Sequence, residues 1–117
     1  LARVVAADLE GAPWPLPDER FDAVLITNYL WRPLWPHLRA ALDDGGVFIY
    51  ETFADGNQHL GRPSNPDFLL RRGELLDACR GLRILAYEDG FLDAPPRQVQ
   101  RIVAVAGADG ERHYPLA

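Results

Sequence analysis

The sequence predicts an α/β protein whose sheet is mostly parallel and ends in an antiparallel hairpin. Two apolar runs of strand length, residues 21–27 and 47–52, flank a segment with helical spacing. Two later strand-like runs, residues 82–87 and 99–105, are joined by a proline-rich connection that is too short for a helix. Uninterrupted apolar strands are typical of parallel sheets, whereas a short connection joins antiparallel neighbours. The order of these elements is that of an α/β fold.

The strand at residues 21–27 is the expected centre of the sheet. It is apolar almost throughout, the pattern of a strand buried on both faces. Before it, residues 3–7 are a short β-branched run followed by a turn-rich stretch, so we expect an additional first strand there.

A helix is expected at residues 33–42, where apolar side chains recur at helical spacing. Pro33 suits the first helical turn, and Gly45 and Gly46 suit the stop. Together with the strands on either side, this helix completes a βαβ unit.

The second half of the chain begins with a long loop. Residues 54–67 show no apolar period, and loops of this length are often functional. A short helix is expected at residues 73–79, and the tail at residues 107–117 is expected to be a frayed end or a weak extra strand.

The composition fits one ordinary globular domain. The chain has 117 residues, of which 48% are hydrophobic and 25% are charged, unlike disordered or fibrous proteins. No apolar run approaches the roughly 18 residues of a transmembrane span. The net charge of -5 disfavours nucleic acid and anionic membranes as partners.

The cysteine count predicts a cytoplasmic protein. Cys79 is the single cysteine, so no disulfide can form within the chain, and no signal-peptide pattern opens the sequence. All 12 basic residues are arginine, and methionine is absent even at position 1. We interpret this as a GC-rich bacterial coding bias and expect the natural start to precede Leu1.

Several segments follow one another at a recognisable spacing. They are Val5-Ala6-Ala7-Asp8-Leu9-Glu10, then Trp14-Pro15-Leu16-Pro17 with Phe21-Asp22-Ala23-Val24, then residues 42–46 before a strand, and the closing hairpin. In this order they resemble the C-terminal part of a class I S-adenosylmethionine-dependent methyltransferase, of the small bacterial type close to tellurite-resistance methyltransferases. The resemblance covers nearly all of residues 3–106.

The resemblance implies a truncated Rossmann-like methyltransferase sheet that keeps strands three to seven. In that family a glycine-rich loop holds the methionine part of the cofactor, and an acidic residue after the second strand holds the ribose. No G-x-G pattern occurs in this sequence. The implied single domain, residues 1–117, divides into a βαβ core with the adenine side (3–53), a substrate-side loop (54–68), a helix with the terminal hairpin (69–106), and a tail (107–117).

Asp8 and Leu9 are the implied adenine contacts. Asp8 follows the first expected strand at the carboxyl edge of the sheet, where ligands collect in open α/β folds. In the resembled family the matching carboxylate accepts a hydrogen bond from the adenine amino group, and the backbone N–H of the next residue meets a ring nitrogen. The alternative is an aspartate that caps a turn.

The residues that end the expected central strand should border the cofactor and its methyl group. Thr27, Asn28 and Leu30 are therefore candidates for cofactor binding. Asn28 can orient a nucleophile, and Tyr29 or Trp31 can lie against adenine or an aromatic substrate. Asn28 and Tyr29 are thus also catalytic candidates, and Tyr29 and Trp31 are substrate candidates. Core packing and helix capping are the alternative.

Four polar residues complete the predicted substrate site: Arg32, Glu51, Asn57 and Arg62. They lie on two segments that are expected to face each other across the carboxyl edge of the sheet. The arginines can clamp an anionic substrate, and Glu51, a third catalytic candidate, can accept a proton from an O–H or N–H nucleophile. The alternative is a structural Arg32–Glu51 ion pair. Methyl transfer needs mainly alignment and a dry pocket, so a base is not required.

The sequence shows no residue pattern for a metal site or for serine hydrolysis. His37, His59, His113 and Cys79 do not have zinc-ligand spacing, so no metal site is expected. Ser64 lies in a turn and not in a nucleophile elbow, which sets serine hydrolysis aside.

Three functions follow from these observations. The first is methyl transfer from S-adenosylmethionine to an unidentified small molecule by a longer or complemented protein. If so, we expect this chain alone to bind the cofactor weakly or not at all and to be inactive. The second is a non-catalytic fragment that acts by self-association or partner binding. The third is another doubly wound protein, such as a response regulator or a dinucleotide-binding domain, and the terminal hairpin argues against it.

The resemblance also predicts how the sheet is completed. Its strand order, 3-2-1-4-5-7-6, places two strands that are absent here between residues 3–7 and 21–27, which leaves an apolar strand edge unpaired. We expect either that residues 3–7 pair directly with residues 21–27, or that a second copy completes the sheet as a homodimer or an exchanged assembly.

Overall fold

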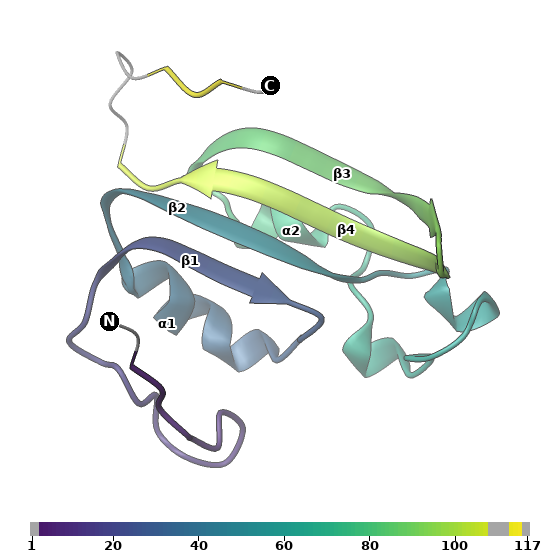
Figure 1. Ribbon diagram of the computed structural model, residues 1–117, viewed down its shortest axis with the longest axis horizontal. Helices are drawn as coiled ribbons and strands as arrows, with labels where there is room; N and C mark the ends of the chain where they lie inside the picture. Colours follow the sequence, from purple (N-terminus) through teal and green to yellow (C-terminus); the bar gives the residue numbers. More distant parts are fainter. Residues whose placement is uncertain (1–2, 108–112, 116–117) are drawn as a thin grey trace.

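The structure is a computed structural model that describes residues 3–107 and 113–115. It contains a four-stranded sheet in the order β1-β2-β4-β3 (Figure 1). The strands are β1 (Phe21–Thr27), β2 (Leu42–Phe53), β3 (Arg83–Asp93) and β4 (Pro96–Val105). The α-helices are α1 (Trp35–Ala40) and α2 (Glu74–Ala78), and the single 3-10 turns are η1 (Arg32–Leu34), η2 (Asn57–His59) and η3 (Pro66–Phe68).

The sheet is mixed. β1 runs parallel to β2 with α1 between them in the chain, so the expected βαβ unit is present. β4 pairs antiparallel with both β2 and β3, which confirms the terminal hairpin. One strand pair of the three is parallel, so the prediction of a mostly parallel sheet is wrong. The described sheet also has four strands where the sequence predicts five.

Residues 3–7 do not form the expected first strand. Their backbone is irregular, and Val4 is 92% exposed. β-branched residues favour extended backbone, but a strand also needs a neighbour that pairs with its N–H and C=O groups. Within the described residues, no backbone hydrogen bond joins residues 3–19 to β1. The expected direct pairing of residues 3–7 with residues 21–27 is therefore absent.

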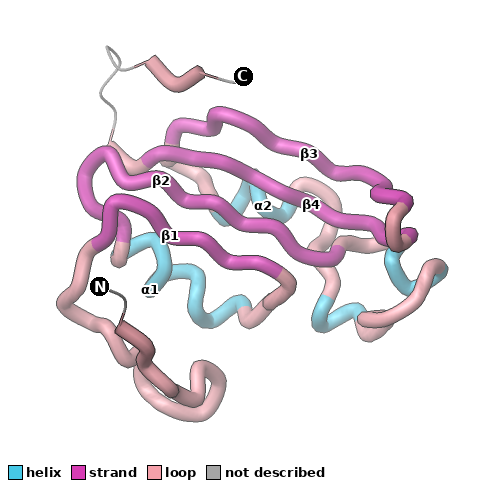
Figure 2. The backbone as a smooth tube through the Cα atoms, in the orientation of Figure 1, coloured by secondary structure: helices cyan, strands magenta, loops and turns pink. Residues whose placement is uncertain are grey.

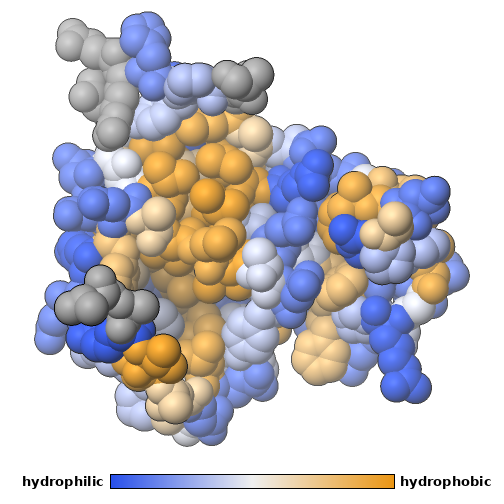
Figure 3. All heavy atoms as spheres, in the orientation of Figure 1, coloured by the Kyte–Doolittle hydropathy of each residue, from blue (hydrophilic) through white to orange (hydrophobic). Residues whose placement is uncertain are grey.

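β1 lies at the edge of the sheet and not at its centre. In Figures 1 and 2, α1 and α2 both lie on the same side of the sheet, so no helix of the described residues covers its opposite side, which is called the bare face below. Leu25 of β1 is 63% exposed there, and it lines a shallow groove together with Ile49 and Val103. Figure 3 shows the apolar residues that gather over this bare face. The apolar pattern of β1 predicts two covered faces, whereas the described chain covers one.

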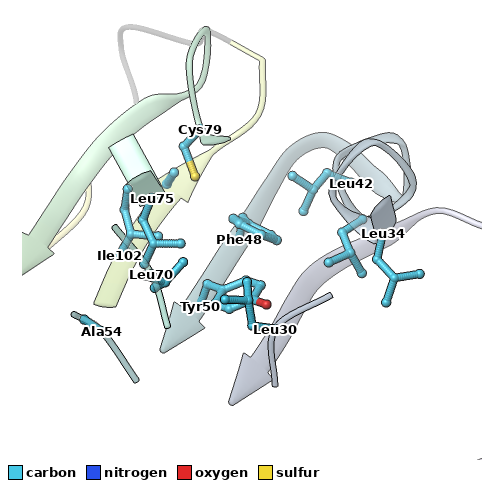
Figure 4. Close-up of a cluster of buried hydrophobic side chains, with 12 residues drawn as sticks. Leu30, Leu34, Leu42, Phe48, Tyr50, Ala54, Leu70, Leu75, Cys79 and Ile102 are labelled. Carbon is cyan, nitrogen blue, oxygen red and sulfur yellow. The ribbon is translucent and has the colours of Figure 1, made fainter. Parts of the chain in front are cut away.

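The hydrophobic core lies between the covered face of the sheet and the helices (Figure 4). Phe48 and Tyr50 of β2 pack with Leu34 of η1, while Leu75 of α2 packs near Cys79. Cys79 is fully buried, and burial raises the pKa of its thiol to about 11. The single cysteine is thus part of the packed interior.

The helix after β1 is shorter than its spacing predicts. The sequence predicts residues 33–42, but α1 ends at Ala40 and β2 begins at Leu42. The expected stop glycines therefore lie inside β2. A Cβ at Gly46 would lie 2.9 Å from the carbonyl oxygen of Phe21, so the close approach of β1 and β2 requires glycine there.

The C-terminal hairpin is longer than the sequence predicts. Pairing continues until Asp93 lies opposite Pro96, so most of the connection expected at residues 88–97 is strand. Residues 113–115 are not in a strand, and the rest of the expected tail, residues 108–112 and 116–117, lies outside the described residues. Among the described helices, none is long and apolar enough to span a membrane.

Candidate functional site

An apolar cavity of about 200 Å³ lies between the N-terminal segment and the βαβ unit. Leu9 and Trp14 form part of one wall, and Tyr29, Trp31 and Tyr50 form part of the other. Four of these five side chains carry a flat aromatic ring, and two of the four, Tyr29 and Tyr50, also carry a hydroxyl. Such a cavity favours a flat, largely apolar ring.

The N-terminal segment is held against the βαβ unit by side chains. The Tyr29 hydroxyl donates a hydrogen bond to Glu10 Oε2 at 2.9 Å. The ring of Trp14 stacks on that of His37, with centroids 5.8 Å apart and 12° between the planes. These contacts place the turn at residues 8–11 beside the end of β1.

Asp8 caps a turn and keeps one carboxylate oxygen unpaired. Its Oδ1 accepts hydrogen bonds from the backbone N–H groups of Glu10 and Gly11, both at 3.0 Å. Within the described residues, neither Asp8 Oδ2 nor the backbone N–H of Leu9 has a hydrogen-bond partner. The turn-capping alternative is therefore present, and it leaves free both groups that the adenine prediction uses.

The residues after β1 separate into different environments. Thr27 is exposed and lines the groove of the bare face, whereas Leu30 is buried in the core. Asn28 is exposed and adopts a left-handed conformation with φ 54°, and its N–H donates to the carbonyl oxygen of Glu51 at 2.9 Å. Tyr29 and Trp31 are the members of this group that line the apolar cavity.

Two tyrosine residues form hydrogen bonds at this turn, Tyr29 through its hydroxyl to Glu10 and Tyr50 through its hydroxyl to the Tyr29 backbone. The hydroxyl of Tyr50, a buried residue of β2, donates a hydrogen bond to the backbone carbonyl of Tyr29. Burial, followed by the hydrogen bond to Glu10, raises the pKa of Tyr29 to about 12. Burial also raises the pKa of Tyr50. Both hydroxyls therefore stay protonated and act as donors near neutral pH.

Arg32 is fully used in structural contacts. Its Nε and Nη2 donate to the two carboxylate oxygens of Glu74 at 2.6 and 2.9 Å. Its other hydrogen bonds go to the backbone carbonyls of Asp67 and Leu69. The partner of Arg32 is thus Glu74 and not Glu51, so the alternative of an Arg32–Glu51 ion pair is wrong.

Glu51 lies on the bare face in a row of charges. Arg101 of β4 contacts Glu51 at 3.3 Å and Glu88 of β3 at 2.6 Å. Glu51 therefore lies away from the cavity that Tyr29 and Leu9 line.

Asn57 and Arg62 differ sharply in their surroundings. Asn57 is 1% exposed, and its side chain bonds to the Pro63 carbonyl oxygen at 2.9 Å and to the Gln98 N–H at 3.1 Å. Both ends of the amide are therefore occupied in holding the loop. Arg62 is exposed and has no hydrogen bond or ion pair within the described residues, so its guanidinium remains available.

Trp14 and Tyr50 are aromatic residues of the cavity wall that lie outside the sequence-based candidates. Glu10, which accepts the hydrogen bond of the Tyr29 hydroxyl, lies outside them as well. Glu10 and Trp14 belong to the segments on which the resemblance rests, so their position was a usable signal. Tyr50 gave none, because a tyrosine within an apolar strand is indistinguishable from ordinary core.

The comparisons with known proteins show which fold this chain resembles. No protein-family model matches the sequence, and no curated protein matches it significantly. Among solved structures, TehB from Haemophilus influenzae, a tellurite-resistance S-adenosylmethionine methyltransferase, matches with a TM-score of 0.59 and 16% sequence identity. The match covers 78% of this chain and 37% of TehB. The chain therefore has part of a methyltransferase-like fold.

Proposed function

We propose that this chain supplies the adenine side of an S-adenosylmethionine-dependent methyltransferase and serves methyl transfer to a small-molecule acceptor as part of a longer or complemented protein. The likeness to TehB supports a coarse methyl-transfer function. The observation that carries the adenine assignment is the pair of unpaired polar groups, Asp8 Oδ2 and the Leu9 N–H, on a turn whose residue Leu9 lines a cavity with aromatic walls.

The residues fit the adenine ring of that cofactor. The 6-amino group of adenine donates hydrogen bonds, and its ring nitrogens accept them. Asp8 offers an acceptor and Leu9 a donor one residue apart, which matches that edge of the ring. The faces of Tyr29 and Trp31 offer apolar contact to the ring itself.

The rest of the cofactor has no counterpart in this sequence. A bound S-adenosylmethionine supplies an activated methyl group on a positively charged sulfur. The glycine-rich loop that holds its amino-acid part in the resembled family is not encoded within these residues. The chain's own contribution is therefore to bind and orient the adenine ring, and Arg62, exposed on the loop after β2, is the proposed contact for an anionic acceptor.

Association without catalysis is the second candidate function. The unpaired edge of β1 and the apolar groove on the bare face favour it, since both are surfaces that proteins usually cover. The two candidates differ in one respect, because only the first requires selective binding of adenine.

Titration of the chain with adenosine, followed by NMR, tests the adenine assignment. We expect adenosine to shift the Leu9 amide resonance and the indole resonances of Trp14 and Trp31. Inosine is the matched ligand, because it carries a carbonyl in place of the 6-amino group and should bind at least about fivefold more weakly, a difference of about 1 kcal/mol.

The control variant is Asp8→Asn. Its amide oxygen can still cap the turn, whereas its NH2 group cannot accept a hydrogen bond from adenine. The variant should bind adenosine more weakly than the unmodified chain does and should lose most of the preference for adenosine over inosine. If the unmodified chain binds the two nucleosides equally, or if the shifts map to the bare face, the proposed function is wrong.

A further inference from the structure

We infer that the hydroxyls of Tyr50 and Tyr29 form two linked hydrogen bonds, called the latch below, that fix the aromatic wall of the cavity against the Asp8–Leu9 turn. Both tyrosines are then positioning residues for the adenine ring. The inference rests on the proposed function. It reassigns Tyr29, which the sequence placed on the acceptor side, to the cofactor side.

The first step of the latch fixes the backbone after β1. Tyr50 is 1% exposed and lies between α1 and the sheet, with its hydroxyl directed toward the end of β1 near Leu30 (Figure 4). That hydroxyl donates to the Tyr29 carbonyl, and the neighbouring Glu51 carbonyl accepts from the Asn28 N–H. The left-handed turn at Asn28 is thus tied to β2 through two consecutive residues of that strand.

The second step joins the two walls of the cavity. The Tyr29 hydroxyl donates to Glu10, and the Glu10 N–H donates to Asp8 Oδ1. Three hydrogen bonds, linked covalently through the residues Tyr29 and Glu10, therefore lead from the buried Tyr50 to the Asp8 carboxylate. If the Tyr29 hydroxyl is removed, no hydrogen bond within the described residues connects the turn at residues 8–11 to the end of β1. If the Tyr50 hydroxyl is removed, that bond remains, but the Tyr29 backbone loses its hydrogen bond to the Tyr50 side chain.

The fold itself has other means of holding these rings. Tyr50 packs edge-on against Trp35 with centroids 6.3 Å apart and lies 5.8 Å from the ring of Phe48. A phenylalanine at position 50 keeps these contacts and loses only the hydroxyl. The hydroxyls therefore matter for alignment of the cavity walls more than for folding.

Amide hydrogen exchange and adenosine titration of the Tyr50→Phe and Tyr29→Phe variants test the latch. We expect the Glu10 and Gly11 amides to exchange about tenfold faster in both variants and adenosine to bind about three- to tenfold more weakly. Tyr29→Phe alters a part-exposed side chain, so it provides the test even if Tyr50→Phe does not fold.

Three further variants separate positioning from a general loss of structure. Tyr87→Phe removes another tyrosine hydroxyl, one that donates to Gln100 at 3.1 Å and does not line the cavity. It should change neither readout by more than about twofold. Glu10→Gln retains an acceptor for Tyr29 and should behave like the unmodified chain, whereas Glu10→Ala should behave like Tyr29→Phe.

The outcomes distinguish this inference from the proposed function. If adenosine and inosine bind the unmodified chain equally, the proposed function fails, and the latch fails with it as a device for positioning adenine. If adenosine binds selectively and Tyr29→Phe changes neither exchange nor affinity, the latch is wrong and the proposed function stands. Faster exchange without a loss of affinity also overturns the positioning role.

Discussion

Arg32 and Glu74 form a two-point ion pair that joins η1 to α2 across 42 residues of sequence. The same Glu74 carboxylate accepts the backbone N–H of Arg71 at 2.8 Å. The pair closes the long segment between β2 and α2 against the βαβ unit. Its side chains are 31% and 9% exposed, so water screens it less than an ordinary surface pair.

Removal of the carboxylate should destabilise the protein. We expect Glu74→Ala to lower the free energy of unfolding by about 2 kcal/mol, because it leaves the part-buried Arg32 guanidinium without its partner. Asp77→Ala on the same helix breaks an exposed pair with Arg80 and should cost about 0.5 kcal/mol or less. Urea denaturation measures both, and equal losses would contradict the role assigned to Glu74.

The same pair should give the stability a pH dependence. Burial alone would raise the pKa of Glu74, but the hydrogen bonds from Arg32 and Arg71 and their charges lower it below its ordinary value of 4.5. The folded protein therefore releases this proton more readily than the unfolded chain does. The stabilisation is complete above the ordinary value and is lost as the pH falls through the lower folded value.

Unfolding of the unmodified chain and of Glu74→Gln from pH 7 to pH 3 checks this sign. The advantage of the unmodified chain should shrink below about pH 4.5. An advantage that stays constant down to pH 3 would mean that the ionisation of Glu74 does not contribute.

Binding of the whole cofactor should be weak. We expect S-adenosylmethionine to bind this chain with low affinity or not at all, because groups for its amino-acid and ribose parts are not encoded here. Isothermal titration calorimetry measures the affinity directly. A dissociation constant in the low micromolar range would mean that another segment replaces the glycine-rich loop.

In a longer active protein, cofactor and acceptor should depend on different residues. We expect Asp8→Ala to weaken cofactor binding by about 1 to 3 kcal/mol through a lost hydrogen bond and an unpaired adenine amino group. Arg62→Ala should instead raise the KM of the acceptor. Steady-state kinetics with each substrate varied in turn separates the two effects, and an equal loss of cofactor affinity in both variants would refute the division.

The bare face and the edge of β1 should cause self-association. We expect the chain to dimerise, or to form larger assemblies, because Leu25 and the unpaired backbone groups of β1 gain partners. Leu25→Lys should shift the chain toward the monomer in sedimentation equilibrium. Leu76→Lys, at a 40% exposed position of α2 on the covered side, is the matched control and should leave the assembly unchanged. A monomeric unmodified chain at high concentration would exclude this interface.

Local sequence patterns were enough to predict β1 and the C-terminal hairpin. β1 has the predicted bounds because its apolar run starts and stops sharply, and the hairpin follows from its short connection. Residues 3–7 carry the same kind of signal but lack a neighbouring strand, and no local pattern reports whether a partner exists.

The candidate site was harder to predict because its residues act over long sequence separations. Arg32 has the chemistry of an anion-binding residue, but Glu74 lies 42 residues away and occupies it. Asn57 looks like an exposed loop amide, but the backbone of β4 takes up its oxygen. The turn-capping alternative for Asp8 could be predicted because its partners are among the next three residues of the chain, whereas its role toward adenine stays a prediction.

The burial of Cys79 makes the protein convenient for site-specific labelling. Its thiol is inaccessible and stays protonated, so maleimide reagents should react slowly with the folded chain. The chain contains no lysine, so its side chains offer no lysine amine to amine-reactive dyes. A cysteine introduced at an exposed loop position can therefore carry a single fluorophore on an otherwise unmodified background.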